Sequence, residues 1–306
     1  MKVAVVQATS IPFETEAAVT KVVDKLREAG SEGAKIAVFP EAFIGGYPKG
    51  ATFGAPLGTR SPEGRELYRR YAEAAITLDG PELESIAQAS AESGVFAVVG
   101  IIERVGKTLY CSVVMIDPEQ GLVGKHRKLM PTALERLTWG FGDGSTLDVV
   151  DSPAGKLGAV VCWENYIPML RQAMYAQGVQ IYCAPTVDDR DTWSASMQHI
   201  AAEGRVFVLS AVQVLHRDQI GEDLYEIADE LGDREQLIRG GSMIVDPLGQ
   251  VLAGPVYGEE TILYADLDLD QLTRGYFDLD VAGHYSRPDV FQLHVNTAPQ
   301  ASVVFE

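Results

Sequence analysis

Three reactive side chains stand at the ends of apolar segments of this sequence. Cys162 ends the run KLGAVVC, Glu41 follows IAVFP, and Lys128 follows the strand-like stretch GLVGKHR. A thiol, a carboxylate and an ammonium suit nucleophilic catalysis, because the carboxylate can take the thiol proton and the ammonium can stabilise developing negative charge. Open α/β sheets bind ligands beyond the carboxyl ends of their strands. The three groups therefore form a plausible shared site.

Taken alone, each of these residues has a simpler interpretation. Most free cysteines are small buried apolar residues. Carboxylates at strand ends are usually solvated or used as caps, and most lysines in a basic cluster are plain surface charges. A helix expected just after Cys162 adds a separate argument for the thiol, because its positive end would favour the thiolate.

Composition restricts the class of protein. Among 306 residues, 46% are hydrophobic and 22% are charged, which is average globular usage and fits disorder or a disulfide scaffold poorly. The formal net charge of −18 opposes binding to nucleic acid or to anionic membranes. No signal region precedes the first strand pattern, and no apolar run approaches about 18 residues, which favours the cytoplasm. Three cysteines cannot all pair, and they lack zinc-ligand spacing.

The elements that must position the reactive residues alternate between strands and helices. Strand patterns at 2–8 and 35–41 enclose a helical pattern at 15–29, which predicts a β-α-β opening. Further helices are expected at 63–76, 82–93, 168–177 and 193–204. Further strands are expected within 95–127, 179–185 and 205–215, with a hairpin within 241–256. This mixture predicts an α/β sandwich in which helices shield the sheet.

The chain is expected to form a single domain over residues 1–306. A polar, acidic stretch at 216–239 departs from the core pattern and is interpreted as a surface loop or short helix. A C-terminal segment is expected over about 276–306.

Several motifs resemble, in the same order, segments of the carbon-nitrogen hydrolase superfamily, and their amino-acid sequences are most similar to its nitrilase branch. The three that carry reactive residues are FPEAFIGGYPKG, HRKLMPTALERLTWGFGDGS and LGAVVCWENYIPMLR. The segments YCAPTVDDRDTW, MQHIAAEGRVFVLSA, GGSMIVDPLG and AGHYSRPDVF extend the resemblance over nearly the whole chain. The resemblance implies a four-layer α-β-β-α sandwich, extended by dimerisation, and a Glu-Lys-Cys triad.

The resemblance also assigns roles to particular residues. By motif, the triad is Glu41, Lys128 and Cys162, and Glu135 would position the lysine and the base. Cys162 would attack a nitrile carbon, Glu41 would take the thiol proton, and Lys128 with a backbone N–H near Trp163 would stabilise the charge on nitrogen. Water would then release ammonia and leave a thioester, whose hydrolysis yields the carboxylic acid. No metal or organic cofactor takes part in this scheme.

The substrate pocket is expected in the loops 44–62, 132–139 and 185–193. The expected substrate contacts are Trp163, Thr132, Pro185 and Thr186. Trp163 favours nitriles over amides, because amidases of the superfamily commonly place other residues after the cysteine. Glu164 is interpreted as a cap for the following helix start. The remaining candidates show no metal-ligand spacing or lie in strand patterns and are interpreted as structural: His126, His199, His216, His284, His294, Cys111 and Cys183.

Three alternatives to an organic nitrilase stay open. An amidase or carbamoyl hydrolase would use the same triad, a cyanide hydratase or dihydratase shares the motif CWE, and an assembly or filament protein would not require the triad. Retention of all three reactive residues favours an enzyme, and nitriles on saturated carbon, including aryl-substituted ones, are the expected substrates. A homodimer or larger homo-oligomer is expected, because a half-sandwich would leave one sheet face apolar and needing cover.

Overall fold

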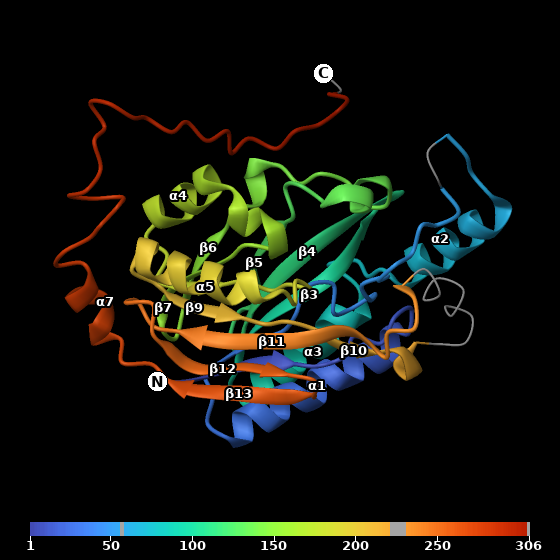
Figure 1. The fold of residues 1–306 in the computed structure, drawn as a ribbon, viewed down its shortest axis with the longest axis horizontal. Helices are drawn as coiled ribbons and strands as arrows, with labels where there is room; N and C mark the ends of the chain where they lie inside the picture. The colour runs from blue at the N-terminus through green and yellow to red at the C-terminus, as the bar shows by residue number, and fades with distance from the viewer. Residues whose placement is uncertain (56–57, 221–230, 305–306) are drawn as a thin grey trace.

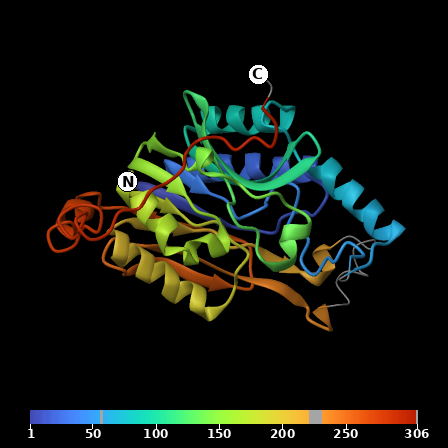
Figure 2. The same ribbon diagram turned by 90° about the horizontal axis from the view of Figure 1, so that it is seen from above.

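The computed structural model describes residues 1–55, 58–220 and 231–304. Two β-sheets lie face to face at the centre, and helices cover their outer faces (Figure 1). Figure 2 shows the blue and teal helices α1 (Thr15–Ser31) and α3 (Pro81–Ser93) on one side. The helices α4 (Pro168–Ala176) and α5 (Asp191–Gly204) lie on the other. The expected order of layers, α-β-β-α, is confirmed.

The first sheet has the strand order β13-β1-β2-β3-β4-β5. Its strands are β1 (Lys2–Gln7), β2 (Ile36–Val38), β3 (Phe96–Val105), β4 (Thr108–Asp117), β5 (Gly121–Arg127) and β13 (Thr261–Asp266). Helix α1 connects the parallel strands β1 and β2, which confirms the β-α-β opening. Successive side chains point to opposite faces of a strand, so Val3 and Val5 join the core between the sheets, whereas Ala4 and Val6 join the core under α1 and α3.

The second sheet has the order β10-β11-β9-β8-β7-β6, and β12 pairs with β11. Its strands are β6 (Val149–Ser152), β7 (Gly155–Ala159), β8 (Ile181–Cys183), β9 (Phe207–Ser210), β10 (Val214–His216), β11 (Gln236–Val245) and β12 (Val251–Tyr257). The strands β7, β8 and β9 are parallel, so the segments that follow them emerge at one edge. This edge carries Cys162 and Thr186.

Shorter elements connect the layers. The remaining helices are α2 (Pro62–Ala74) and α7 (Asp270–Gly275), and the 3-10 helices are η1 (Ala133–Leu137), η2 (Gly144–Thr146), η3 (Cys162–Tyr166) and η4 (Arg217–Gln219). None of the helices in the described ranges has the length and apolar character needed to cross a membrane.

The expected half-sandwich, in which one apolar sheet face needs cover from a second chain, is not what the structure shows. Both sheets belong to one chain, and β1 contacts β11 across the interior while β5 contacts β6. The inner face of the first sheet and the second sheet share one hydrophobic core. The apolar face that was expected to need a partner is therefore covered from within, and an uncovered face no longer requires an oligomer.

Two expected boundaries in the second sheet are also wrong. Residues 205–215 form two strands, β9 and β10, because the chain leaves the ladder between them and passes the segment of Glu41, where Gln213 binds. The end of the stretch 216–239 belongs to β11, in which Ile238 pairs with Leu215 and is fully buried. Leu237 and Ile238 are both buried although neighbouring residues point to opposite faces of a strand, so this end of the stretch belongs to the core. Residues 221–230 of this stretch lie outside the described residues.

The C-terminal segment crosses the outside of the molecule after α7 (Figure 1). Residues 276–304 form no helix or strand. The segment returns to the N-terminus of η2, where the backbone N–H of Gln300 donates to the Asp143 carboxylate at 2.8 Å. Its side chains Phe277 and Phe291 are 91% and 80% exposed.

Candidate active site

The three predicted reactive residues meet between the two sheets. Glu41 follows β2, Lys128 follows β5 directly, and Cys162 follows β7. Their side chains are buried. The Lys128 Nζ lies 2.7 Å from Glu41 Oε1, and the Cys162 thiol hydrogen-bonds the same carboxylate. Residues separated by more than a hundred positions in the chain thus share one polar cluster, as their places at strand ends predicted.

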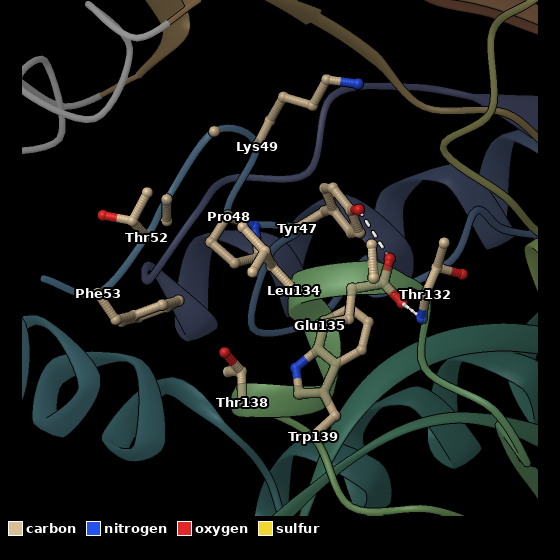
Figure 3. A pocket seen from close by; sticks show the side chains of 13 residues that line it. Tyr47, Pro48, Lys49, Thr52, Phe53, Thr132, Leu134, Glu135, Thr138 and Trp139 are labelled. Atoms are coloured by element: carbon tan, nitrogen blue, oxygen red, sulfur yellow. Dashed lines mark hydrogen bonds between the residues drawn. The ribbon is translucent and has the colours of Figure 1, made fainter. Parts of the chain in front are cut away.

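Lys128 is held between two carboxylates. Besides Glu41, its Nζ contacts Glu135 Oε2 at 2.8 Å. Glu135 accepts two further hydrogen bonds, from the backbone N–H of Thr132 at 2.6 Å and from the Tyr47 hydroxyl at 2.8 Å (Figure 3). The Glu135 side chain is therefore fixed from three directions, and through it the ammonium of Lys128 is fixed as well.

Glu41 is fixed by its backbone and by its side chain. Its Oε2 accepts from the backbone N–H of Val187 at 3.2 Å, and its carbonyl oxygen accepts from Gln213 Nε2 at 2.6 Å. The Cys111 thiol lies 3.6 Å from Oε1. The segment also packs tightly on β3, because a Cβ at Gly100 would lie 2.1 Å from the Pro40 carbonyl oxygen. Only glycine at position 100 allows this approach.

Cys162 stands on a strained turn. Its φ of +52° is in the left-handed region of backbone conformation, which residues other than glycine adopt at an energetic cost. The turn is held because the backbone N–H of Cys162 donates to the Pro185 carbonyl at 2.9 Å and Asn165 Nδ2 donates to the Cys162 carbonyl at 2.8 Å. The Thr186 hydroxyl donates to Sγ at 3.1 Å. These hydrogen bonds to the backbone and to Sγ together hold the sulfur in one position.

Burial and charge set the proton positions in the cluster. Burial raises the pKa of Glu41, and the opposing effect of the Lys128 ammonium is smaller. Burial alone would lower the pKa of Lys128, but Glu41, the two neighbouring cysteines and Glu135 together outweigh it, and the pKa lies well above its ordinary value. Burial, and after it Glu41, raises the pKa of Cys162 far above the usual range of a thiol. The nearby helix start was expected to favour the thiolate, whereas burial acts in the opposite direction and favours the thiol.

Two neighbouring cavities reach this cluster. The cavity at Cys162 has a volume of about 210 Å³ and is lined by Tyr47, Lys49, Thr132, Glu135, Cys162, Trp163, Val187, Asp188, Asp189 and Arg190. A second cavity of about 350 Å³ shares Tyr47, Lys49, Thr132 and Glu135 with the first. Figure 3 shows this second cavity, whose apolar wall is built by Pro48, Phe53, Leu134 and Trp139.

The four predicted substrate contacts divide into two kinds. Thr132 and Trp163 line the cavity at Cys162, and their contact with substrate stays a prediction. Pro185 and Thr186 do not line either cavity and instead hold the backbone and the sulfur of Cys162. Their part in the site is therefore the placement of the thiol.

The Trp163 ring is held at the cavity rather than packed in the core. Its side chain is 41% exposed, and its Nε1 donates to Asp188 Oδ2 at 2.9 Å. The Arg190 guanidinium lies over the ring, 4.5 Å from its centre. A ring anchored at its edge and covered on one face presents a fixed wall to the cavity.

Some residues of the cluster escaped the sequence interpretation. Tyr47 and Gln213 were not singled out, although Gln213 is the polar residue within the apolar run SAVQVL. Cys111 was interpreted as a core thiol, and it is buried, but it also contacts Glu41. Glu164 does not cap the following helix α4, which has no side-chain cap; it accepts from the backbone N–H of Val161 and contacts His126, which was taken as structural.

Within the described ranges, no group of three or more His, Cys, Asp or Glu side chains is arranged to hold a metal ion. Chemistry without a metal stays a prediction.

Residues 2–275 match the family of carbon-nitrogen hydrolases. The chain is 60% identical over 302 residues to a nitrilase of Bradyrhizobium diazoefficiens, covering 99% of this chain and 94% of that protein. It is 56% identical over 304 residues to an aliphatic nitrilase of Sinorhizobium fredii, covering 99% and 98% of the two chains.

The fold is similar to that of a solved structure from Saccharomyces cerevisiae, a member of branch 10 of the nitrilase superfamily. The TM-score is 0.71 at 19% sequence identity, over 93% of this chain and 96% of the other. The sequence match over most of the chain and the shared architecture agree, and the chain belongs to the carbon-nitrogen hydrolase family.

Proposed function

We propose that this protein hydrolyses an organic nitrile to the carboxylic acid and ammonia, with Cys162 as nucleophile. The observation that carries the proposal is the buried cluster in which one carboxylate, Glu41, contacts both the Cys162 thiol and the Lys128 ammonium. The high identity to proteins named as nitrilases supports nitriles as the substrate class.

The first half of the reaction forms a covalent intermediate. Glu41 takes the proton of the Cys162 thiol, and the thiolate attacks the nitrile carbon. A carbon–nitrogen π pair moves onto nitrogen, where the Lys128 ammonium stabilises the growing charge, and Glu41 passes the thiol proton to this nitrogen to complete the thioimidate. The raised pKa of Glu41 suits this role, because a base works best when its pKa approaches the operating pH.

The second half of the reaction consumes two waters. Glu41 takes a proton from the first water, and the oxygen of this water adds to the thioimidate carbon. The carbon–nitrogen bond then breaks, ammonia leaves, and a thioester to Cys162 remains. The second water cleaves the thioester, which releases the carboxylic acid and restores the thiol. Glu135 carries no proton in this scheme and holds Lys128 in place.

We propose nitriles on saturated carbon, including aryl-substituted ones, as substrates. The cavity beyond Glu135 supports this choice, because Phe53, Leu134 and Trp139 give it an apolar wall and it adjoins the cavity at the Cys162 thiol. An apolar substituent buried there would contribute binding free energy in proportion to its area.

The test compares a nitrile, its amide and cyanide in parallel, with ammonia release as the readout. We expect the organic nitrile to be consumed fastest, and faster consumption of the amide or of cyanide would favour the corresponding rival. Rapid quenching with a slow nitrile should add mass to the peptide that contains Cys162 and not to those with Cys111 or Cys183. Cys162→Ala should lose the adduct and essentially all turnover while keeping its fold. Normal turnover by this variant would overturn the mechanism.

We also propose a homo-oligomer in the cytoplasm. The exposed aromatic side chains of the C-terminal segment support association between copies, and the three free thiols suit a reducing compartment. Light scattering at working concentration tests the first point, and a monomer would count against it.

A further inference from the structure

A buried carboxylate outside the triad joins the two segments that carry Lys128 and Cys162. Glu164, the third residue of η3, is 1% exposed. Its Oε1 accepts from the backbone N–H of Leu129 at 2.6 Å, and its Oε2 accepts from the backbone N–H of Val161 at 3.1 Å. One donor is the residue after the lysine and the other is the residue before the cysteine. Glu164 therefore links the backbone segments that carry the Lys128 and Cys162 side chains.

The partner of this carboxylate is a buried histidine. His126 is 1% exposed, and its Nε2 lies 3.1 Å and 3.3 Å from the two Glu164 oxygens. Its Nδ1 lies 3.0 Å from the carbonyl oxygen of Thr146. A carbonyl oxygen only accepts hydrogen bonds, and an ionised carboxylate does the same. An imidazole whose two nitrogens both face acceptors has a good hydrogen bond at each only when both carry a proton.

The strand geometry connects this histidine to the lysine. His126 is two residues before Lys128 at the end of β5, and residues two apart in a strand lie on the same face. Opposite them on β4 are Val113 and, one ladder step further, Cys111, whose carbonyl accepts from the backbone N–H of Lys128 at 2.8 Å. A displacement of the His126 ring therefore shifts the backbone segment that positions the Lys128 ammonium.

We propose that His126 is held as an imidazolium between Glu164 and Thr146, and that this buried ion pair positions Lys128 and Cys162 relative to one another. His126 and Glu164 are positioning residues in this inference, because neither lines the cavity at the thiol. The inference rests on the proposed function for the roles of Lys128 and Cys162.

The surrounding charges agree with a protonated ring. Burial acts to lower the pKa of His126, but the Glu164 carboxylate, the Thr146 carbonyl and Asp148 together outweigh it, and the pKa is raised. Asp148 faces the ring as a second negative group. The buried phenol of Tyr182, which Glu164 also influences, is uncharged at neutral pH because burial raises its pKa. The imidazolium is therefore the cation that balances Glu164 in this part of the core.

The first experiment needs no activity and uses the wild-type protein. Nitrogen-15 NMR of the histidine-labelled chain between pH 6 and pH 8 should show one ring with both nitrogens protonated throughout, assigned by its loss in His126→Gln. A neutral His126 ring at pH 7 would overturn the proposal. This readout stands even if the protein hydrolyses no nitrile, in which case the proposed function fails and the ion pair survives.

The second experiment measures positioning. In His126→Gln we expect kcat to fall about 10²-fold with KM little changed, because a displacement of about 1 Å at a reacting group can cost that much. The matched control is His199→Gln on α5, whose side chain is 66% exposed and contacts Glu203 rather than the site. It should keep wild-type kcat and KM. A lower midpoint of thermal unfolding with unchanged kcat in His126→Gln would show a purely structural role and overturn the positioning.

Discussion

Two buried ion clusters meet at the end of β5, and only one of them belongs to the candidate site. Lys128 points to Glu41 and Glu135. Arg127, one residue earlier, pairs with Glu103, with Nη2 2.6 Å from Oε1. Neighbouring residues on a strand face opposite sides, so adjacent cations serve separate networks.

The clusters differ in the balance of charge around their carboxylates. Glu103 takes hydrogen bonds from Arg127, Lys125 and Ser112, and although burial opposes them, its pKa is lowered. Glu41 shares the single ammonium of Lys128 with Glu135, and its pKa is raised. One carboxylate with two cations becomes a permanent anion, whereas two carboxylates with one cation leave a group that can take a proton. Burial and ion pairing alone therefore do not mark a catalytic base.

The largest expected effect is the difference in kcat/KM between substitutions of the two neighbouring cations, Lys128 and Arg127. Lys128→Met should lower kcat/KM about 10² to 10³-fold, because removing one donor to a developing anion costs about 2.7 to 4 kcal/mol. Arg127→Met should leave kcat near wild type and destabilise the fold by about 1–3 kcal/mol, because it strips hydrogen bonds from the buried Glu103. Nitrile kinetics and denaturant unfolding of both variants check this. If folded Arg127→Met protein lacked activity, the division between the clusters would be wrong.

The next effect concerns the placement of the base. Gly100→Ala should push the segment of Glu41 away from β3, since the new Cβ would meet backbone atoms of Pro40 and Ala42. A loss of about 10²-fold in kcat is expected from a shift of about 1 Å. Gly80→Ala is the control, because the nearest atom to its Cβ is the mobile end of the Glu82 side chain. Wild-type kcat in Gly100→Ala would show that the close approach does not set the position of Glu41.

A smaller effect is expected from a third ion pair, His126 with Glu164. Its cation is an imidazolium, which loses its proton as the pH rises. Burial lowers the pKa of His126, but Glu164 with Thr146 and Asp148 raises it further than burial lowers it, so this pair stabilises the fold fully below the unfolded pKa of about 6.5. The contribution is lost as pH rises through the raised pKa. The free energy of unfolding should therefore decline above about pH 6.5 more steeply in the wild type than in His126→Gln. Denaturant titrations from pH 6 to 9 measure both slopes, and equal slopes would count against the pair.

The smallest effect is expected from chelators. The scheme assigns no step to a metal, so prolonged treatment with a strong chelator should leave nitrile turnover unchanged. Loss of activity that added zinc restores would replace the triad mechanism with a metal-dependent one.

Local sequence patterns predicted most elements of the fold. The strand Lys2–Gln7 and the helices Thr15–Ser31 and Pro168–Ala176 lie within a few residues of their expected positions, because apolar periodicity and turn residues act over short distances. The expectations failed where an element depends on a distant partner. Ile238 became part of a strand because it pairs with Leu215, across a stretch that reads as polar surface.

The sequence by itself determined the residues of the candidate site, the family and the layered class, because motif wording and periodicity are properties of short segments. Tertiary structure decided what surrounds those residues. Gln213 reaches the Glu41 carbonyl across 172 positions, Glu164 joins the segments of Lys128 and Cys162, and both sheets close within one chain. It also created the burial that raises the pKa of the thiol, against the direction expected from the nearby helix start. Burial and distant charges set a pKa, and both arise only when remote parts of the chain are brought together.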